Sequence, residues 1–318
     1  MSLYEIFSHS DRYHYRANLF SLATCFVFLC AVLTFLPPFL FAYFAGGYWV
    51  KESTYSEQPR VNYSSQYILT MGDPQPSSSP FFSSSYASLN SMFQNAFIPG
   101  TCTFLAIDNN NDQVTDQFSI SLQFSYSSDI TLNNLNLFLI FQYELRARQA
   151  ITMQTMLLIN LFPPTSTTLS SNPNVVTAGE LFLDQRQPIQ SSGTDLTYNT
   201  SIIDLSNLYT SSSLNLDSVL NDYFTRNYYT TYQSEYVKWQ PGLAPGTNNL
   251  TINVTIDIVS QSIRFIPGFW QEFKWGWIQY VSVLLPFIYV FNYIKEFVFR
   301  HQLVRTLVEL PYHRYKDK

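Results

Sequence analysis

The feature that most constrains this chain is a segment of 20 residues without a charged side chain, Trp275 to Ile294, bounded by Lys274 and Lys295. A helix of this length spans about 30 Å, the thickness of the hydrocarbon core of a bilayer. A buried helix of a soluble protein is the alternative, but such helices usually keep a polar face. We therefore predict a transmembrane helix, in which neighbouring helices or waters accommodate Pro286. Aromatic residues of the kind found at membrane interfaces flank it: Trp270, Trp275, Trp277, Tyr280, Tyr289 and Tyr293.

A second charge-free run extends from Ala17 to Val50, and its most apolar part, Leu19 to Phe44, predicts another transmembrane helix. Pro37 and Pro38 are expected to end or kink this helix late in the run. Arg12 and Arg16 precede it and favour a cytosolic N-terminus. The alternative is a cleaved signal peptide, since the chain has a basic start and an Ala45-Gly46-Gly47 exit. The apolar cores of signal peptides are shorter, about 7–15 residues.

Charge is distributed unevenly around these two runs. Between Gly46 and Glu272 there are eight Lys or Arg and 17 Asp or Glu, a balance of −9, whereas the tail from Lys295 has six basic and three acidic residues, a balance of +3. The basic tail suits the cytosolic side of a membrane, and the acidic middle then lies outside the cytosol. An acidic middle also argues against nucleic acid as a partner. Only Cys102 lies in that middle, so its stability has to come from a packed core and not from an internal disulfide.

Alternating apolar residues predict that the middle is rich in β-strands. The clearest strands are 247–258, 118–126, 135–145 and 151–159, the last two joined through Arg146-Ala147-Arg148. Further strands are expected at 61–70, 101–107, 176–183, 196–205 and 228–239, and one helix at 216–224. The run Asp73–Ser91 is predicted to be a low-complexity loop. Many short strands separated by Pro, Asn, Ser and Gly favour a mainly antiparallel β-sandwich.

The predicted organisation therefore has two transmembrane helices flanking an extracytosolic β-rich domain. The expected parts are a cytosolic N-terminal segment (1–18), helix 1 (19–44), the β-rich domain (47–266), an interfacial junction (267–274), helix 2 (275–294) and a basic cytosolic tail (295–318). In the junction, Pro267 disfavours a continuing strand, Gly268 permits a sharp turn, and Phe269 and Trp270 suit the headgroup region. We predict that the junction fixes the orientation of the domain on the membrane, while the alternative is that its aromatic residues only anchor the helix.

The middle contains few residues that could support catalysis. All four histidines, His9, His14, His301 and His313, lie in the terminal segments, so the middle has no histidine for a catalytic triad or a Cys/His zinc site. No glycine-rich phosphate loop is present, and no pair of carboxylates is singled out. We expect no enzyme activity and no organic cofactor. Four glycosylation sequons begin at Asn62, Asn199, Asn249 and Asn253, all in the middle.

One acidic turn could bind a metal ion. Asp108, Asn110, Asp112 and Asp116 place oxygen ligands at relative positions 1, 3, 5 and 9 of a calcium loop. The turn has Gln113 where such loops have glycine, and Ser119 where they have a bidentate glutamate. The alternative is a hairpin turn rich in Asx hydrogen bonds. Within the second helix, Gln279 and Ser282 are i, i+3 neighbours that could face the first helix or a partner.

A set of short motifs runs through nearly the whole chain. They are Leu3-Tyr4-Glu5, Phe7-Ser8-His9, Tyr15-Arg16-Ala17, Leu33-Thr34, Pro37-Pro38, Trp49, Lys51, Tyr55, Glu57-Gln58-Pro59, Asp112, Thr115-Asp116, Met153-Gln154-Thr155-Met156, Gln187-Pro188, Pro267-Gly268-Phe269-Trp270, Gln279-Tyr280-Val281-Ser282 and Phe297-Val298-Phe299. In these residues and in their order the chain resembles the transmembrane protein 231 family of the ciliary transition zone. In the family's acidic turn a glycine is usual where Gln113 stands here.

The resemblance implies a non-enzymatic membrane subunit of the tectonic-like (Meckel syndrome) complex. Such a subunit would contribute to cilium assembly and to the diffusion barrier between ciliary and plasma membranes, with other transition-zone membrane and scaffold proteins as partners. The alternative function is an auxiliary glycoprotein subunit of a membrane transporter or flippase. Subunits of that kind usually carry several extracytosolic disulfides, which a single Cys102 does not allow.

Overall fold

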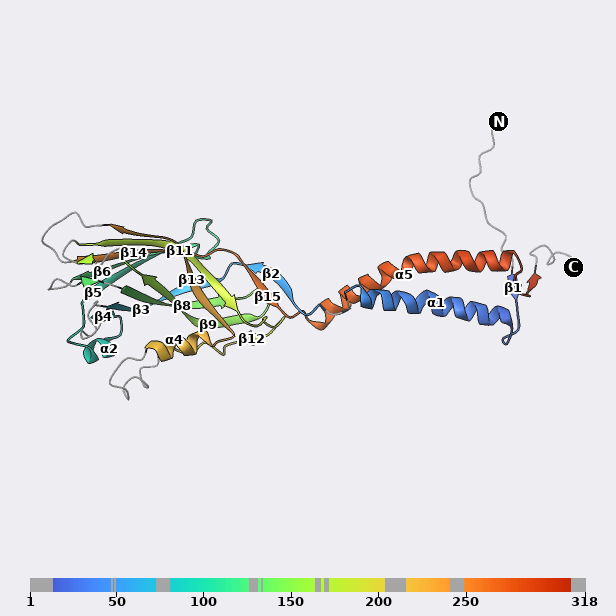
Figure 1. Cartoon of the computed structure of the whole chain (residues 1–318), viewed down its shortest axis with the longest axis horizontal. Coiled ribbons are helices and arrows are strands. Elements are labelled where there is room, and N and C mark those ends of the chain that lie inside the picture. The colour runs from blue at the N-terminus through green and yellow to red at the C-terminus, as the bar shows by residue number, and fades with distance from the viewer. Residues whose placement is uncertain are drawn as a thin grey trace, which may run out of the picture. The chain divides into compact units, whose positions relative to one another are not determined.

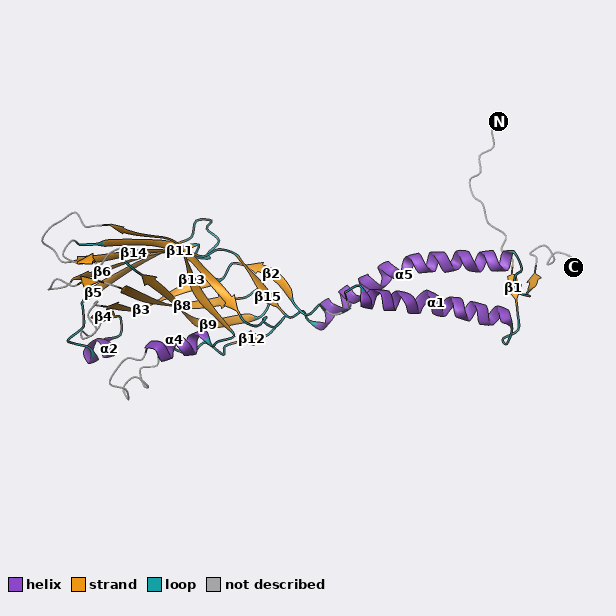
Figure 2. Cartoon of the chain, viewed as in Figure 1, coloured by secondary structure: helices purple, strands orange, loops and turns teal. Residues whose placement is uncertain are grey.

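The computed structural model divides the chain into two compact units. Residues 52–267 form one unit, and residues 1–51 with 268–318 form the other. Figure 2 shows the two long helices in one unit and the large β-sheets in the other. The structure describes residues 14–46, 48, 50–72, 81–125, 131–132, 134–163, 167–168, 172–203, 216–240 and 249–309.

The β-rich unit is a sandwich of two five-stranded sheets (Figure 1). The first sheet has the spatial order β12 (Thr194–Asp195), β9 (Ala150–Leu161), β8 (Asn134–Leu145), β3 (Arg60–Gly72) and β4 (Phe81–Ser84). The second has the order β13 (Tyr228–Gln240), β11 (Asn174–Gln185), β14 (Asn249–Asp257), β6 (Gln117–Ser125) and β5 (Gly100–Ile107). Two small antiparallel pairs join β15 (Gln261–Phe265) to β2 (Ser53–Glu57) and β10 (Thr167–Thr168) to β7 (Thr131–Leu132).

Most strand pairs are antiparallel, which confirms the predicted fold class. The exceptions are β11 with β14 and β12 with β9, which pair in parallel. Every second side chain of these strands points toward the facing sheet, in agreement with the alternation of apolar residues in the sequence. In β14, Leu250, Ile252, Val254 and Ile256 are buried, and the residues between them are half-buried. Their counterparts on β6, β8 and β9 complete one continuous core between the sheets.

A second, smaller core covers part of the outer face of the first sheet. Helices α2 (Ala87–Met92) and α4 (Leu216–Phe224) contribute Leu89 and Tyr223 to it, against Phe138, Ile140 and Met156 of β8 and β9. Strand β8 is therefore buried on both faces here. That explains its unbroken apolar run from Leu137 to Phe141, which differs from the alternation seen in β14.

Several expectations for the middle were wrong in detail. The predicted strand at 196–205 does not form in its described part, because Asp195 accepts hydrogen bonds from the backbone and hydroxyl of Thr197 and turns the chain. The predicted loop 73–91 contains β4 and all of α2 except its last residue, since Phe82 and Leu89 supply buried apolar side chains. Residues 73–80 lie outside the described residues. The predicted helix at 216–224 and the other strands are confirmed, with small differences at their ends.

The second unit is a pair of apolar helices, α1 (Leu22–Phe44) and α5 (Phe269–Arg300). Both are long and apolar enough to cross a membrane. They lie side by side (Figure 1), and small or compact side chains of α1 are buried between them: Ala23, Cys30, Thr34, Pro38 and Ala42. Such residues let membrane helices approach closely.

Helix boundaries differ from those expected at three places. Helix α1 begins at Leu22, three residues after the predicted start, and it ends at Phe44, the predicted end. Of the two effects expected of Pro37 and Pro38, ending the helix does not occur, because both lie inside α1. Helix α5 begins at Phe269 and includes most of the expected junction, because charged residues such as Glu272 and Lys274 limit a membrane span but not a helix. It also continues to Arg300, beyond the span predicted to end at Ile294.

Helix α5 ends in a hydrogen-bonded cap. Gln302 has a φ of 50°, its N–H donates to the carbonyl of Phe299, and the N–H of Leu303 donates to that of Val298. This is the Schellman arrangement, in which glycine usually holds the left-handed position. The chain then turns so that β16 (Leu307–Glu309) pairs with β1 (His14–Arg16). The segments before α1 and after α5 are thereby joined into one two-stranded element.

Candidate interaction surfaces

The acidic turn between β5 and β6 uses its oxygen atoms in its own hydrogen bonds. Carboxylate oxygens of Asp108 accept from the backbone N–H groups of Asp112 and Gln113, and Asp112 accepts from that of Val114. The amide oxygen of Asn110 accepts from the N–H of Asp112, at 2.9 Å. This pattern is that of an Asx-rich turn. Among the described residues, no group of three or more His, Cys, Asp or Glu is arranged to hold a metal ion. Calcium binding stays a prediction.

Asp116 connects this turn to the β2–β3 segment. One oxygen of Asp116 accepts from the amide of Gln58 at 2.8 Å, and the other accepts from the N–H of Asn109. Hydrogen bonds from Gln58 and from this backbone lower the pKa of Asp116. The same Gln58 amide donates to the carbonyl of Ile258 at the end of β14. Gln58 therefore fixes the acidic turn to the sheet.

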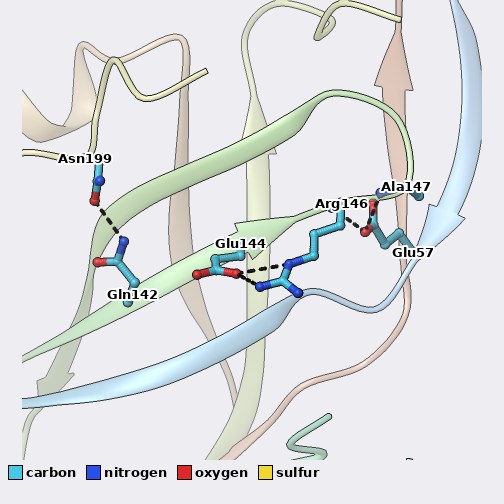
Figure 3. Close-up of polar contacts among 6 residues, drawn as sticks. All are labelled: Glu57, Gln142, Glu144, Arg146, Ala147 and Asn199. Atoms are coloured by element: carbon cyan, nitrogen blue, oxygen red, sulfur yellow. Dashed lines mark hydrogen bonds and ion pairs between the residues drawn. The ribbon is translucent and has the colours of Figure 1, made fainter. Parts of the chain in front are cut away.

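Glu57, the residue before Gln58, holds the turn between β8 and β9 (Figure 3). Its carboxylate accepts from the backbone N–H groups of Arg146 and Ala147, at 2.7 and 2.9 Å. The guanidinium of Arg146 forms an ion pair with Glu144 at 2.6 Å. The Glu57-Gln58 pair thus anchors two different turns. Sequence reasoning assigned no role to either residue, because their partners are about 60 to 200 positions away in the chain.

The four sequons differ in their surroundings. Asn62 and Asn199 are exposed. Asn62 pairs in register with Gln142 of β8, and the amide of Gln142 donates to the side-chain oxygen of Asn199 at 2.8 Å (Figure 3). Both sequons therefore lie on one outer face of the first sheet. Asn253 is half-buried in β14 and uses its amide nitrogen to donate to Asn174. Asn249 is exposed, and its side-chain oxygen accepts from Ser125.

The outer edge of β5 carries exposed apolar side chains. Phe104 is 50% exposed and Leu105 is 60% exposed, and no residue of Gly100–Ile107 is charged. The edge strand of the same sheet on the other side, β13, carries Glu235 and Lys238. Charged residues on an edge oppose pairing with other strands, so β5 is the less protected edge. Cys102 of β5 is half-buried beside the hydroxyl of Tyr63, and burial raises the pKa of its thiol.

Polar side chains of the helix pair make few contacts. The hydroxyl of Ser282 donates to the carbonyl of Ile278 within α5, at 2.6 Å. The side-chain oxygen of Gln279 is buried and has no hydrogen-bond partner among the described residues. Tyr280 donates to the carbonyl of Phe35 in α1, at 3.5 Å. Of these three side chains, Tyr280 is the one with a hydrogen bond to α1 in the described part of the chain. A role of Gln279 and Ser282 toward a partner stays a prediction.

The predicted junction residues lie at the start of α5. Pro267 is buried, Gly268 caps the helix, and Phe269 and Trp270 are 64% and 78% exposed. The rings of Phe269, Trp270 and Phe273 pack on one another, with centroids 5.5 to 6.3 Å apart. Only Ile266, Pro267 and Gly268 separate β15 from α5. The connection between this strand and this helix is therefore three residues long.

Comparison with known proteins gives a consistent family assignment. A relative from Xenopus tropicalis named Transmembrane protein 231 is 33% identical over 308 residues, covering 96% of each chain. The human protein of that name is 34% identical over 311 residues, covering 96% of this chain and 95% of its own, and the Gallus gallus protein is 34% identical over 310 residues, covering 96% and 94%. No solved structure matches the chain. The family profile described as Transmembrane protein 231 matches residues 1–308, and the chain belongs to this family of membrane proteins.

Proposed function

We propose that this chain is a non-enzymatic membrane subunit of the ciliary transition-zone (tectonic-like) complex, where it contributes to cilium assembly and to the diffusion barrier between ciliary and plasma membranes. The observation that carries the proposal is the family match over 96% of the chain, which includes both helices and the whole sandwich. The polar clusters described above support a structural role, since each of them holds a turn or a strand in place.

Localisation tests this proposal directly. The chain, tagged at its C-terminus and expressed in ciliated cells that lack their own copy, is expected to concentrate at the base of the cilium and to restore exclusion of plasma-membrane proteins. Proximity labelling from the same tag should recover other transition-zone proteins. An even distribution over the plasma membrane would contradict the proposal. Co-purification with a polytopic pump whose surface delivery depends on this chain would favour the alternative, an auxiliary subunit.

The proposed topology places the sandwich outside the cytosol and both termini inside it. The balance of −9 in the middle against +3 in the tail supports this arrangement. Asn62 and Asn199 are exposed, so we expect both to be glycosylated, whereas Asn253 uses its amide nitrogen within the sheet. Glycosidase treatment should increase gel mobility, and Asn62→Gln with Asn199→Gln should abolish that shift. Protease protection of a C-terminal tag in sealed vesicles would overturn the topology.

We further propose that the β5 edge is where an extended strand of another extracytosolic domain joins the second sheet. Strand addition uses the unpaired backbone groups of an edge strand, and the partner's apolar side chains would cover Phe104 and Leu105. Leu105→Lys should reduce recovery of transition-zone partners while leaving the sandwich folded. Val237→Lys on the opposite edge is the matched control, since Val237 is 42% exposed and lies on a strand that already carries charges. Equal recovery with both variants would exclude the β5 edge.

The junction residues Pro267, Gly268, Phe269 and Trp270 are proposed to orient the sandwich on the membrane. The three-residue connection supports this role, because a short segment restricts the directions available to the domain. The double variant Gly268→Val with Trp270→Ala should insert and be glycosylated normally, yet assemble poorly. If this variant co-purifies with its partners and localises as the wild type does, the aromatic residues only anchor the helix.

A further inference from the structure

Two grooves meet at the start of α1, inside the helical unit. One measures about 670 Å³ and lies between α1 and the segment that follows α5, and the other measures about 520 Å³ and lies along the neighbouring face of α1. Both are bordered by Ser21, Leu22 and Cys25. The first is otherwise lined by Phe26, Leu29, Leu303, Val304 and Arg305, and the second by Leu19, Phe20, Thr24 and Phe28. Most of these residues are apolar, and the charged one among them is Arg305.

The walls of the grooves are held in place by the protein itself. Pairing of β1 with β16 joins the segment before α1 to the segment after α5 (Figure 1). Tyr15 of β1 and Phe26 of α1 both pack on Phe299 of α5, with ring centroids 5.5 and 6.1 Å apart. Ser21 caps α1 by accepting a hydrogen bond from the N–H of Thr24, at 3.3 Å. The grooves therefore exist before any ligand enters.

Large apolar side chains around the grooves are exposed. Leu19 is 85% exposed, Leu22 is 83% exposed and Leu303 is 65% exposed. Water covers such a surface unfavourably. Leu22 is also the first residue of a helix that is long and apolar enough to cross a membrane, so the grooves open where acyl chains are available. The occupant of the grooves is therefore expected to be apolar along most of its length.

The charge beside the grooves is positive. Arg305 and Arg300 are exposed, and no ion pair of either is found within the described part of the chain. Residues 14–21 and 295–309 together contain four Lys or Arg and two Glu, a balance of +2. The first turn of α1 has no acidic residue that would repel an anion. Charge complementarity therefore favours an occupant with a negatively charged end.

An anionic phospholipid combines these two properties in one molecule. Its phosphate suits the guanidinium of Arg305, which can donate two parallel hydrogen bonds to phosphate oxygens. Its two acyl chains suit two apolar grooves that meet at a common border. An acidic protein segment would satisfy Arg305 but would leave the apolar walls on α1 uncovered. A zwitterionic lipid also has a phosphate, but its ammonium group would meet the positive charge of Arg300 and Arg305.

We propose that the start of α1 binds an anionic phospholipid, with its phosphate at Arg305 and one acyl chain in each of the two grooves that Leu22 and Cys25 separate. The proposal goes beyond the ciliary function. It rests on the proposed topology in one respect, because that topology places this end of the helices at the cytosolic leaflet, where anionic lipids are concentrated. The competing occupant is an acidic segment of another protein.

The test uses the full chain purified in detergent and titrated with phosphatidylserine or phosphatidylcholine of identical acyl chains, with bound lipid counted by native mass spectrometry. The first lipid bound should show about a fivefold preference for phosphatidylserine. Arg305→Gln removes the charge beside the grooves and should reduce the preference to less than about twofold, by the same reasoning. Lys274→Gln removes the same charge near the other end of α5 and is the matched control, which should keep the preference of the wild type.

A second variant tests the grooves without changing the charge. Cys25→Trp places an indole ring at their common border, and it should weaken binding of the first phosphatidylserine by about fivefold or more. Undiminished binding by this variant would place the lipid outside the grooves and overturn the proposal, even if Arg305→Gln lost its preference.

Three further outcomes would also overturn the proposal. They are equal binding of the two lipids by the wild type, an equal fall in preference for Lys274→Gln and Arg305→Gln, and displacement of phosphatidylserine by an equimolar hexaglutamate peptide. The second would show that net charge sets the preference, and the third would favour an acidic protein segment. Binding in detergent depends neither on topology nor on ciliary localisation, so this proposal and the proposed function fail separately.

Discussion

Strand β8 and helix α5 are both strongly apolar, yet they use their apolar side chains in opposite ways. In β8, Leu137, Leu139 and Ile140 are completely buried inside the sandwich. In α5, no residue of the 32 is buried, and Leu285 is 60% exposed. The sandwich removes apolar surface from water by packing, whereas the helix pair requires lipid to cover it. Strand β8 and helix α5 are both rich in apolar residues. Whether such a residue stabilises the fold by packing or faces lipid depends on its surroundings.

The largest expected effect comes from making the same substitution in both regions. Leu139→Ala leaves a cavity in the sandwich core and should lower its free energy of unfolding by about 2–5 kcal/mol. Leu285→Ala removes a side chain that faces outward and should change stability by less than about 0.5 kcal/mol. Hydrogen exchange of β8 and α5 amides, in the full chain reconstituted in a bilayer, measures both. A comparable loss for Leu285→Ala would show that α5 packs against a further protein surface.

A smaller effect is expected from a buried tyrosine hydroxyl in the sandwich. The hydroxyl of Tyr223 accepts from the N–H groups of Thr230 and Met156 and also contacts the hydroxyl of Thr155. Tyr223→Phe removes the acceptor of the two N–H groups in the second core, at a cost of about 1–3 kcal/mol. Tyr229→Phe is the control, since Tyr229 is half-buried and bonds to Asp184. Equal exchange rates in the two variants would contradict this role.

The regions also differ in how far the sequence predicted them. In β6 and β14, alternating apolar side chains indicate one buried face. In α5, the charge-free run indicates contact with lipid. These elements were therefore predictable. The contacts of Glu57, Gln58 and Tyr223 were not, because each depends on strand register and on partners far away in the chain. Strand β15 was not predicted, because it has only five residues and their alternation is too short to indicate a strand.

The arrangement of α1 against the start of α5 was unpredictable for a related reason. Sequence spacing marks Trp277 and Tyr280 as interfacial aromatic residues, which is a property of position along the helix. Whether they line a groove depends on Tyr48, which follows α1 and lies against Gly276. The pairing of β1 with β16 likewise joins segments that are separated by almost the whole chain.

Acid should weaken the sandwich through Asp195. Burial raises the pKa of Asp195, but hydrogen bonds from Thr197 and Tyr228 lower it more, so its pKa lies below the ordinary value. A carboxyl with a lowered pKa stabilises the folded state above its unfolded pKa, and this contribution is lost as the pH falls through the folded value. Asp195→Asn should therefore flatten the decline in sandwich stability below about pH 4. An unchanged pH profile would mean that other carboxyl groups dominate.

The smallest expected effect concerns two glutamines that occupy left-handed backbone positions, one in each unit. Gln113 in the acidic turn has a φ of 67°, and Gln302 at the end of α5 has a φ of 50°. Left-handed backbone costs an ordinary residue about 1–2 kcal/mol, and glycine avoids this cost while losing about 0.5–1 kcal/mol of chain entropy. Gln113→Gly should thus stabilise the sandwich by about 0.5–1 kcal/mol, and Gln302→Gly should slow exchange only in the last turn of α5 and in β16. The effect of Gln113→Gly is expected to reach the whole sandwich, unlike that of Gln302→Gly, because Gln58 ties the acidic turn to the end of β14. If Gln113→Gly left sandwich exchange unchanged, the turn would open independently of the core, and the anchoring role of Gln58 would be wrong.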